Sequence, residues 1–232
     1  MRRFYKTVEA AREADGWAIR LDGRPVRTLA RASLVVPGEA LAKAIADEWR
    51  VQGETIDPAT MPMTGFANAT LDRVLPALAD FRVQIAVYAA SDLFCYRAAD
   101  PPALAALQAA HWDALLDWAR ARYDVSFAVT AGIMPVDQPE ATLARLAAVV
   151  EAIEPWRLAG AAVLTQISGS LVGLLAHLEG EIDAQALFEA TTLDERWQAE
   201  QWGEDEEAAA RLAARRADFL NAARWCALAR AD

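Results

Sequence analysis

The sequence is poor in the residues that most enzymes use for catalysis or metal binding. Its 232 residues include only two histidines, His111 and His177, and two cysteines, Cys95 and Cys226. It contains no Cys-x-x-Cys pair and no His-Glu-x-x-His motif, and the glycines near residue 170 lack the lysine of a phosphate-binding loop. We therefore expect no metal, no bound cofactor, no catalytic residues and no disulfide framework. A reducing compartment fits this cysteine content.

Positively charged residues are outnumbered by acidic ones, 23 to 33. The net charge is -10 and the isoelectric point about 4.8, so the phosphates of nucleic acids and anionic lipid surfaces would repel the chain. An acidic chain suits a basic or amphipathic protein partner, although acidity most often serves solubility alone. Because 55% of the residues are hydrophobic, the chain can form a substantial core.

One long segment without charged side chains raises the question of a membrane span. Residues 158–178 contain no Asp, Glu, Lys or Arg, and a spanning helix needs about 20 apolar residues. Polar side chains dilute the segment, and acidic residues follow it at once. We expect a single buried central helix over 156–178, in which Gly160, Gly169 and Gly173 allow neighbours to approach closely. Insertion into a membrane is the alternative.

Periodicity predicts an α+β fold: a small strand-containing domain over residues 1–75, and a larger all-helical, orthogonal bundle-like domain over 76–232. The alternating runs 4–8, 17–21, 24–28 and 34–36 predict short strands, with a hairpin turn at Asp22-Gly23. Helices are expected over 37–49, 64–74, 140–152, 156–178, 183–202 and 204–230. Apolar stripes starting at Leu78 and at Leu104 predict two more.

One enzymatic alternative stays open. A small-molecule hydrolase could use Cys95 as the nucleophile, His111 as the base, and Asp92 or Asp113 to orient that base. The apolar setting of Cys95 argues against this, since it raises the pKa of a thiol, and such a cysteine is more often a core residue. The stretch His111-Trp112-Asp113 is the best local metal candidate, but His111 lies on an apolar stripe and is expected at the core or its rim.

Tryptophan is the unusual residue of this chain, with eight copies. Amphipathic aromatic residues are enriched at protein interfaces, and Trp197 and Trp202 are the best candidates for one. In the helix expected over 183–202, Glu195, Gln198 and Trp202 share a face. That mixed surface predicts partner binding. The alternative is that Glu195 merely forms an ion pair with Arg196 or with an arginine of the next helix.

Several motifs occur together and in order along nearly the whole chain. They are Arg-Phe-Tyr-Lys at 3–6, Leu-Asp-Gly-Arg-Pro-Val-Arg-Thr at 21–28, the block from Glu48 to Thr64, residues 68–74, Cys-Tyr-Arg at 95–97, Trp-Asp at 112–113, Trp-Ala at 118–119, Arg-Tyr at 122–123 and Gln-Trp-Gly at 201–203. The chain thereby resembles the F1-ATPase assembly chaperones that bind the α subunit of ATP synthase. The block from Glu48 to Thr64 is the most specific part.

The resemblance implies a chaperone that is not an enzyme. Such chaperones hold the unassembled α subunit, whose apolar interface is an aggregation hazard, until the β subunit takes over. The acidic position on which the family's function depends falls on Asp194-Glu195, and we favour Glu195. The expected partner-binding residues are Glu195, Asp194, Gln198, Trp202 and Trp197. The family's Glu-Trp pair falls on Glu48 and Trp49, for which we expect a structural role.

Two departures from the family pattern concern loops. Leu29 stands where the family often has proline, and Gly65-Phe66 stands where a more polar pair is expected. The chain begins at the family's first motif, without a mitochondrial presequence. We therefore expect a bacterial cytoplasmic protein that is monomeric when free.

Overall fold

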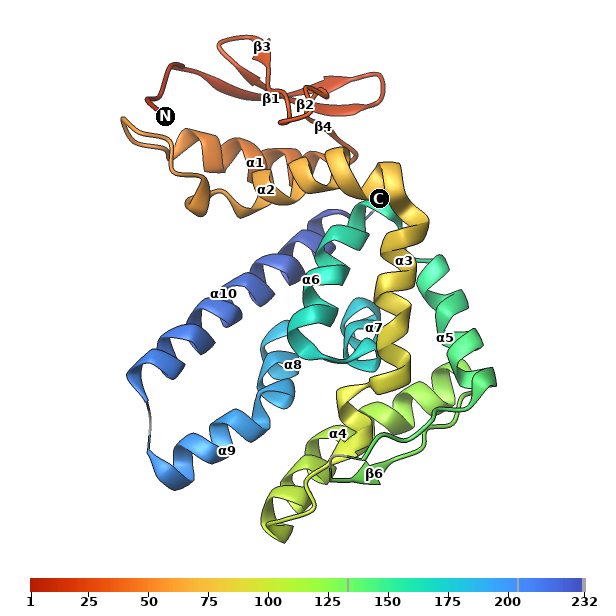
Figure 1. Cartoon of the computed structure of the whole chain (residues 1–232). Coiled ribbons are helices and arrows are strands. Elements are labelled where there is room, and N and C mark those ends of the chain that lie inside the picture. The colour runs from red at the N-terminus through yellow and green to blue at the C-terminus, as the bar shows by residue number, and fades with distance from the viewer. Residues whose placement is uncertain (133, 204, 231–232) are drawn as a thin grey trace. The chain divides into compact units, whose positions relative to one another are not determined.

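The computed structural model describes residues 1–132, 134–203 and 205–230, which fall into two compact units (Figure 1). Unit 1 contains Met1–Leu78, Glu154–Gly160 and the chain from Asn221 onward; unit 2 contains Ala79–Ile153 and Ala161–Leu220. A small strand region precedes a mostly helical body, which confirms the predicted α+β fold class. The domain boundary after residue 75 stays a prediction, and these units interleave along the chain.

The sheet of unit 1 is built on one hairpin. β1 (Val8–Glu13) pairs antiparallel with β2 (Gly16–Leu21), which also pairs with β3 (Arg24–Pro25) and β4 (Val35–Val36). The turn at Asp22-Gly23 has φ values of 48° and 76°, the left-handed geometry that this dipeptide favours. The hairpin prediction is therefore confirmed.

The strand expected over residues 4–8 was wrong, because β1 starts only at Val8. The backbone N–H groups of Lys6 and Thr7 donate to the carboxylate of Asp22 instead of to a neighbouring strand. The Tyr5 hydroxyl donates to the Trp49 carbonyl oxygen at 2.6 Å. The N–H groups that would otherwise bond to a neighbouring strand thus bond to a side chain.

Helices follow the sheet in unit 1. They are α1 (Glu39–Arg50), the 3-10 turn η1 (Pro58–Thr60), α2 (Pro62–Ala69), the π turn η2 (Thr70–Val74) and the 3-10 turn η3 (Leu75–Ala77). The helix predicted from residue 37 begins two residues later, and the one predicted from residue 64 begins two residues earlier. The irregular geometry after α2 coincides with Pro76, which has no N–H to donate.

The C-terminal end of the chain completes the core of unit 1. Trp225 is fully buried, stacks on Phe66 with ring centroids 5.5 Å apart, and donates its indole N–H to the Trp156 carbonyl oxygen at 2.7 Å. A Cβ atom on Gly160 would lie 2.6 Å from the Cys226 sulfur. Gly160 therefore permits the close approach that the sequence predicted.

Unit 2 is almost entirely helical. Its elements are α3 (Leu78–Ala86), η4 (Val87–Ser91), η5 (Leu93–Cys95), β5 (Tyr96–Arg97), α4 (Pro102–Tyr123), β6 (Thr130–Ala131), α5 (Glu140–Glu151), most of α6 (Leu158–Ser168), α7 (Leu171–Glu179), α8 (Ala184–Thr191), α9 (Leu193–Trp202) and the first part of α10 (Glu206–Leu228). The turn η6 (Pro155–Arg157) belongs to unit 1. β5 and β6 form a short parallel pair that the sequence did not predict.

The single helix expected over 156–178 was wrong, because the segment is two helices, α6 and α7, broken at Gly169. Gly169 has φ +67°, a left-handed conformation that glycine tolerates best. The buried Asp92 carboxylate accepts hydrogen bonds from the Ser170 hydroxyl and the Val172 N–H, both at 2.8 Å, and so caps the start of α7. Within the described residues, no helix has the length and apolarity that crossing a membrane requires.

The helix expected over 183–202 is also divided, into α8 and α9. The break falls at Thr192, a buried β-branched residue with φ -107° and ψ 16°, whose hydroxyl donates to the Phe188 carbonyl oxygen. The last helix, expected from residue 204, begins at Glu206, and position 204 itself lies outside the described residues.

Candidate functional site

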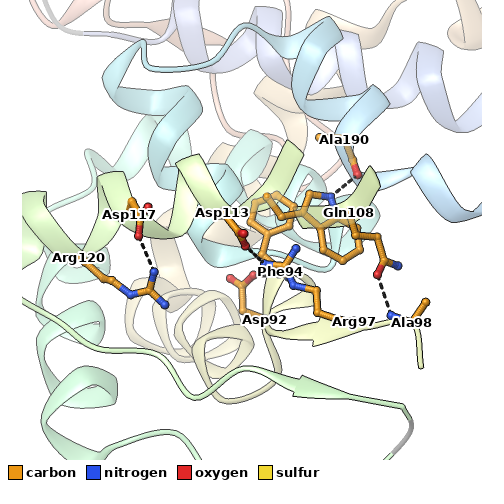
Figure 2. A network of polar contacts seen from close by, with 10 residues as sticks. Asp92, Phe94, Arg97, Ala98, Gln108, Asp113, Asp117, Arg120 and Ala190 are labelled. Carbon is orange, nitrogen blue, oxygen red and sulfur yellow. Dashed lines mark hydrogen bonds and ion pairs between the residues drawn. The ribbon is translucent and has the colours of Figure 1, made fainter. Parts of the chain in front are cut away.

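Helix α9, which carries the predicted partner-binding residues, is anchored at its N-terminal end. Leu193 is buried, and the Asp194 carboxylate accepts a hydrogen bond from the Gln108 side-chain amide at 2.7 Å. Gln108, a buried residue of α4, in turn accepts from the backbone N–H of Ala98 (Figure 2). Asp194 thus has a partner inside the protein, and it fixes where α9 begins.

A second contact holds the end of the preceding helix α8 to α4. The indole of Trp112 is fully buried and donates to the Ala190 carbonyl oxygen at 2.8 Å. Arg97 lies over the Trp112 ring, 5.1 Å from its centroid, and forms an ion pair with Asp113. The start of α9 is therefore set by a network of α4 side chains, which the sequence pattern did not reveal.

The Glu195 carboxylate is occupied by an ion pair. Arg215 Nη1 of α10 lies 2.8 Å from Oε1 and 2.9 Å from Oε2 of Glu195. The two side chains are 49% and 41% exposed, so water screens the pair substantially. The sequence alternative, in which Glu195 pairs with an arginine of the next helix, is present in the structure. Arg196 is not that arginine.

Three predicted residues lie farther along α9. Trp202, at its C-terminal end, is 78% exposed, and Gln198 one turn earlier is also exposed. Trp197 is half-buried. Within the described part of the chain, Trp202 is the only tryptophan among the exposed large hydrophobic residues. Because exposing an indole costs hydrophobic free energy, this position is a candidate contact for a partner.

Glu48 and Trp49 lie in unit 1, at the end of α1. The Glu48 carboxylate is buried and accepts hydrogen bonds from the N–H groups of Met63 and Thr64 and from the Thr64 hydroxyl, at 2.6 to 2.8 Å. It thereby satisfies the free N–H groups of the first turn of α2. Trp49 packs edge-on against Tyr5 with ring centroids 5.7 Å apart. Both side chains thus contact other residues of unit 1.

The hydrolase arrangement is not assembled. Cys95 is fully buried, and burial raises the pKa of its thiol to about 12, whereas His111 is exposed. No hydrogen bond joins their side chains in the part of the chain that the structure describes. Asp113 pairs with Arg97, and Asp92 caps α7. The expectation that His111 lies at the core or its rim was therefore also wrong.

The buried carboxyl group of Asp92 has a raised pKa. It is fully buried, and the loss of hydration raises its pKa to about 6, although the hydrogen bonds from Val172 and Ser170 oppose that rise. In the residues that the structure describes, no group of three His, Cys, Asp or Glu side chains could hold a metal ion. Asp92 thus has a structural role at the break between α6 and α7.

The chain has the fold of a class of chaperone proteins. It superposes on the crystal structure of Atp12 from Paracoccus denitrificans with a TM-score of 0.95 and 40% identity, over 99% of this chain and 98% of that one. A variant of that protein with an aspartate replaced by lysine gives the same values. The crystal structure of the Atu1473 protein, a putative chaperone from Agrobacterium tumefaciens, matches at 38% identity and a TM-score of 0.94, over 99% of this chain and 86% of that one.

The family is equally clear from the sequence. The family model described as ATP12 chaperone protein matches residues 2–120. This chain therefore belongs to the ATP12 chaperone family, which confirms the family resemblance. Membership supports a role as an assembly chaperone of ATP synthase.

Proposed function

We propose that this chaperone binds the unassembled α subunit of F1-ATPase and prevents its aggregation until the subunit is assembled, and that it does so without catalysing a reaction. Membership of the ATP12 chaperone family supports the assembly role. The observation that supports a protein partner most directly is the exposed Trp202 at the C-terminal end of α9.

The contact surface that we assign is the face of α9 formed by Gln198 and Trp202. A chaperone must release its client, and a mixed surface of one indole beside amide and carboxylate groups binds less permanently than a wholly apolar one. Trp197, which is half-buried beside this face, completes it.

Asp194 and Glu195 have a different place in this proposal. Their carboxylates are taken up by Gln108 and Arg215, so we assign them the role of holding α9 in position for the partner. This separates positioning residues from contact residues within the set expected from the sequence.

The proposed setting is the bacterial cytoplasm, and the proposed free form is a monomer. Where F1 assembles, one chaperone would cover one α subunit at a time, and the β subunit would displace it by competing for the same apolar interface.

The proposal is tested by diluting F1 α subunit from denaturant into buffer with increasing chaperone and following light scattering. Wild-type protein is expected to suppress scattering at near-stoichiometric amounts, without ATP. Trp202→Ala should raise the half-suppressing concentration about tenfold, the effect of losing a central aromatic contact. Leu29→Ala, at a residue 94% exposed in unit 1, is the matched control and should behave as wild type. Undiminished aggregation with the wild-type protein would refute the function.

A further inference from the structure

α9 and α10 belong to the same helical hairpin in unit 2, yet they hardly pack against each other. Only residues 203–205 separate their ends, and Glu195 and Arg215 join them at the far end of α9. Between those two points the helices do not approach closely, whereas α8 and α9 do (Figure 1). Two helices joined by so short a connection ordinarily bury their facing sides against each other.

The space between them is a groove. One cavity of about 350 Å³ is lined by Glu195, Arg196, Ala199, Glu200, Asp205, Ala208, Ala209 and Leu212. A second, of about 410 Å³, continues it along α8 and α10. The two share Arg196, Ala209 and Leu212 and therefore adjoin, and together we call them the α9–α10 groove. Its combined size is that of a site for several side chains.

Most of the apolar side chains that line the groove are small. They are Ala199 of α9 and Ala208, Ala209 and Ala213 of α10, and Leu212 is the larger apolar side chain that α10 adds to them. Ala209 and Leu212 are half-buried, so part of each side chain is open to an occupant of the groove. Such a lining admits apolar side chains brought by another chain and gains hydrophobic free energy when they enter.

Charge distinguishes the two ends. At the end near Trp202, Glu200 lines the groove without an ion-pair partner among the described residues, and Asp205 adjoins it as the acceptor for the Ala208 N–H. At the other end Arg216, which donates to the Gln185 side-chain oxygen, lies with Glu189, and Arg196 lies in the part that both cavities share. An occupant that is apolar in its middle and basic at one end would match this distribution.

Resting on the proposed function, we propose that the α9–α10 groove receives one amphipathic segment of the F1 α subunit, with apolar side chains against Ala209 and Leu212 and a basic side chain toward Glu200. The Glu195–Arg215 pair joins α9 to α10 beside the groove, and Trp202 lies exposed at the end of α9 that carries Glu200. The groove thus adds a binding site to the contact face of α9. Because its two ends differ in charge, the bound segment takes one orientation.

Filling the groove tests the proposal. Ala209→Trp puts an indole into the shared part of both cavities, whereas Ala210→Trp puts the same indole on the next, exposed position of α10, which lines neither cavity. In the scattering assay, Ala209→Trp is expected to raise the half-suppressing concentration about tenfold or more, and Ala210→Trp to leave it within about twofold of wild type. Circular dichroism checks that both variants keep the wild-type helix content.

A charge reversal tests the predicted basic end. Glu200→Lys should weaken suppression several-fold and reduce its salt dependence. Asp218→Lys, an equal change at an exposed residue of α10 outside the groove, is the control and should do neither.

The outcomes separate the two proposals. If the wild-type protein suppresses aggregation and Ala209→Trp does so equally well, the groove proposal is overturned while the function stands. If the wild-type protein fails, both proposals fall. If the wild-type protein self-associates with rising concentration and Ala209→Trp is monomeric in sedimentation, the occupant is a second copy of the chain, and the groove proposal is again overturned.

Discussion

Replacing Glu195 with lysine puts a second cation against Arg215, at a contact where nitrogen and oxygen now lie 2.8 Å apart. Because the two side chains are 49% and 41% exposed, the pair contributes at most about 1 kcal/mol to the free energy of unfolding. Glu195→Lys is therefore expected to lower the thermal midpoint by only about 2–4 °C for a chain of this size. Helix content measured by circular dichroism should be unchanged.

The effect on the partner should be much larger. Without the pair, α9 loses its contact with α10 beside the α9–α10 groove, and the surface bearing Gln198 and Trp202 loses its fixed orientation. We expect the half-suppressing concentration in the α-subunit scattering assay to rise about tenfold, equivalent to about 1.4 kcal/mol of binding free energy. Arg215→Glu, which opposes two carboxylates at the same place, should weaken suppression to a similar extent.

The double variant Glu195→Lys/Arg215→Glu decides between positioning and direct contact. It restores an ion pair in reversed order, so it should recover suppression to within about threefold of wild type. If the double variant stays as weak as Glu195→Lys, and Arg215→Glu alone behaves as wild type, Glu195 contacts the partner itself and its assignment as a positioning residue is refuted.

Three further predictions concern the fold. Glu48→Ala should lower the free energy of unfolding by about 2–4 kcal/mol, because it leaves buried N–H groups of α2 without an acceptor. Chemical denaturation measures this loss, and a value below about 0.5 kcal/mol would contradict the capping role. For Asp92, a folded-state pKa of about 6 against an ordinary value near 3.8 means that the native state binds the proton more tightly. Its contribution to stability should therefore fall as pH rises from about 4 to 6, and the wild-type minus Asp92→Asn difference in denaturation midpoints should carry that slope; a flat difference would contradict it. Gly160→Ala should destabilise the protein by about 1–3 kcal/mol, because the added Cβ clashes with Cys226. Gly65→Ala, where nothing lies within 4 Å of the added Cβ, should be neutral or slightly stabilising. Equal thermal shifts in the two variants would count against the close packing of α6 and α10.

Local patterns predicted the parts of the fold that local physics decides. The Asp22-Gly23 dipeptide specifies a left-handed turn whatever surrounds it, and the helical periodicity located α1, α4 and α5 to within a few residues. The class of fold follows from such elements taken together.

Features that depend on distant residues could not be predicted in this way. The break between α6 and α7 is held by Asp92, which lies 78 residues before the Ser170 that it binds. The indole of Trp225 closes the core of unit 1 by donating to Trp156, 69 residues earlier. Hydrophobic periodicity relates only residues along one helix, so the sequence pattern predicted α6 and α7 as a single helix.

The candidate site, too, could be predicted only in part from the sequence. The resemblance placed the site on the helix that ends at Trp202, and the exposed indole is where that reading expected an interface residue. The partner of Glu195 lies 20 residues away on α10, beyond the reach of the three- and four-residue spacings that reveal ion pairs within a helix. The α9–α10 groove is a space left between two helices, and no sequence pattern marks such a space.

The most direct test of the chaperone role is the solubility of the F1 α subunit when it is produced in bacterial cells, with and without this protein and in the absence of the β subunit. Co-production with the wild-type chain should move most of the α subunit from the insoluble to the soluble fraction, where it should co-purify with the chaperone, and Trp202→Ala should largely abolish that shift. An α subunit that remains equally insoluble with and without the wild-type protein would contradict the proposed function.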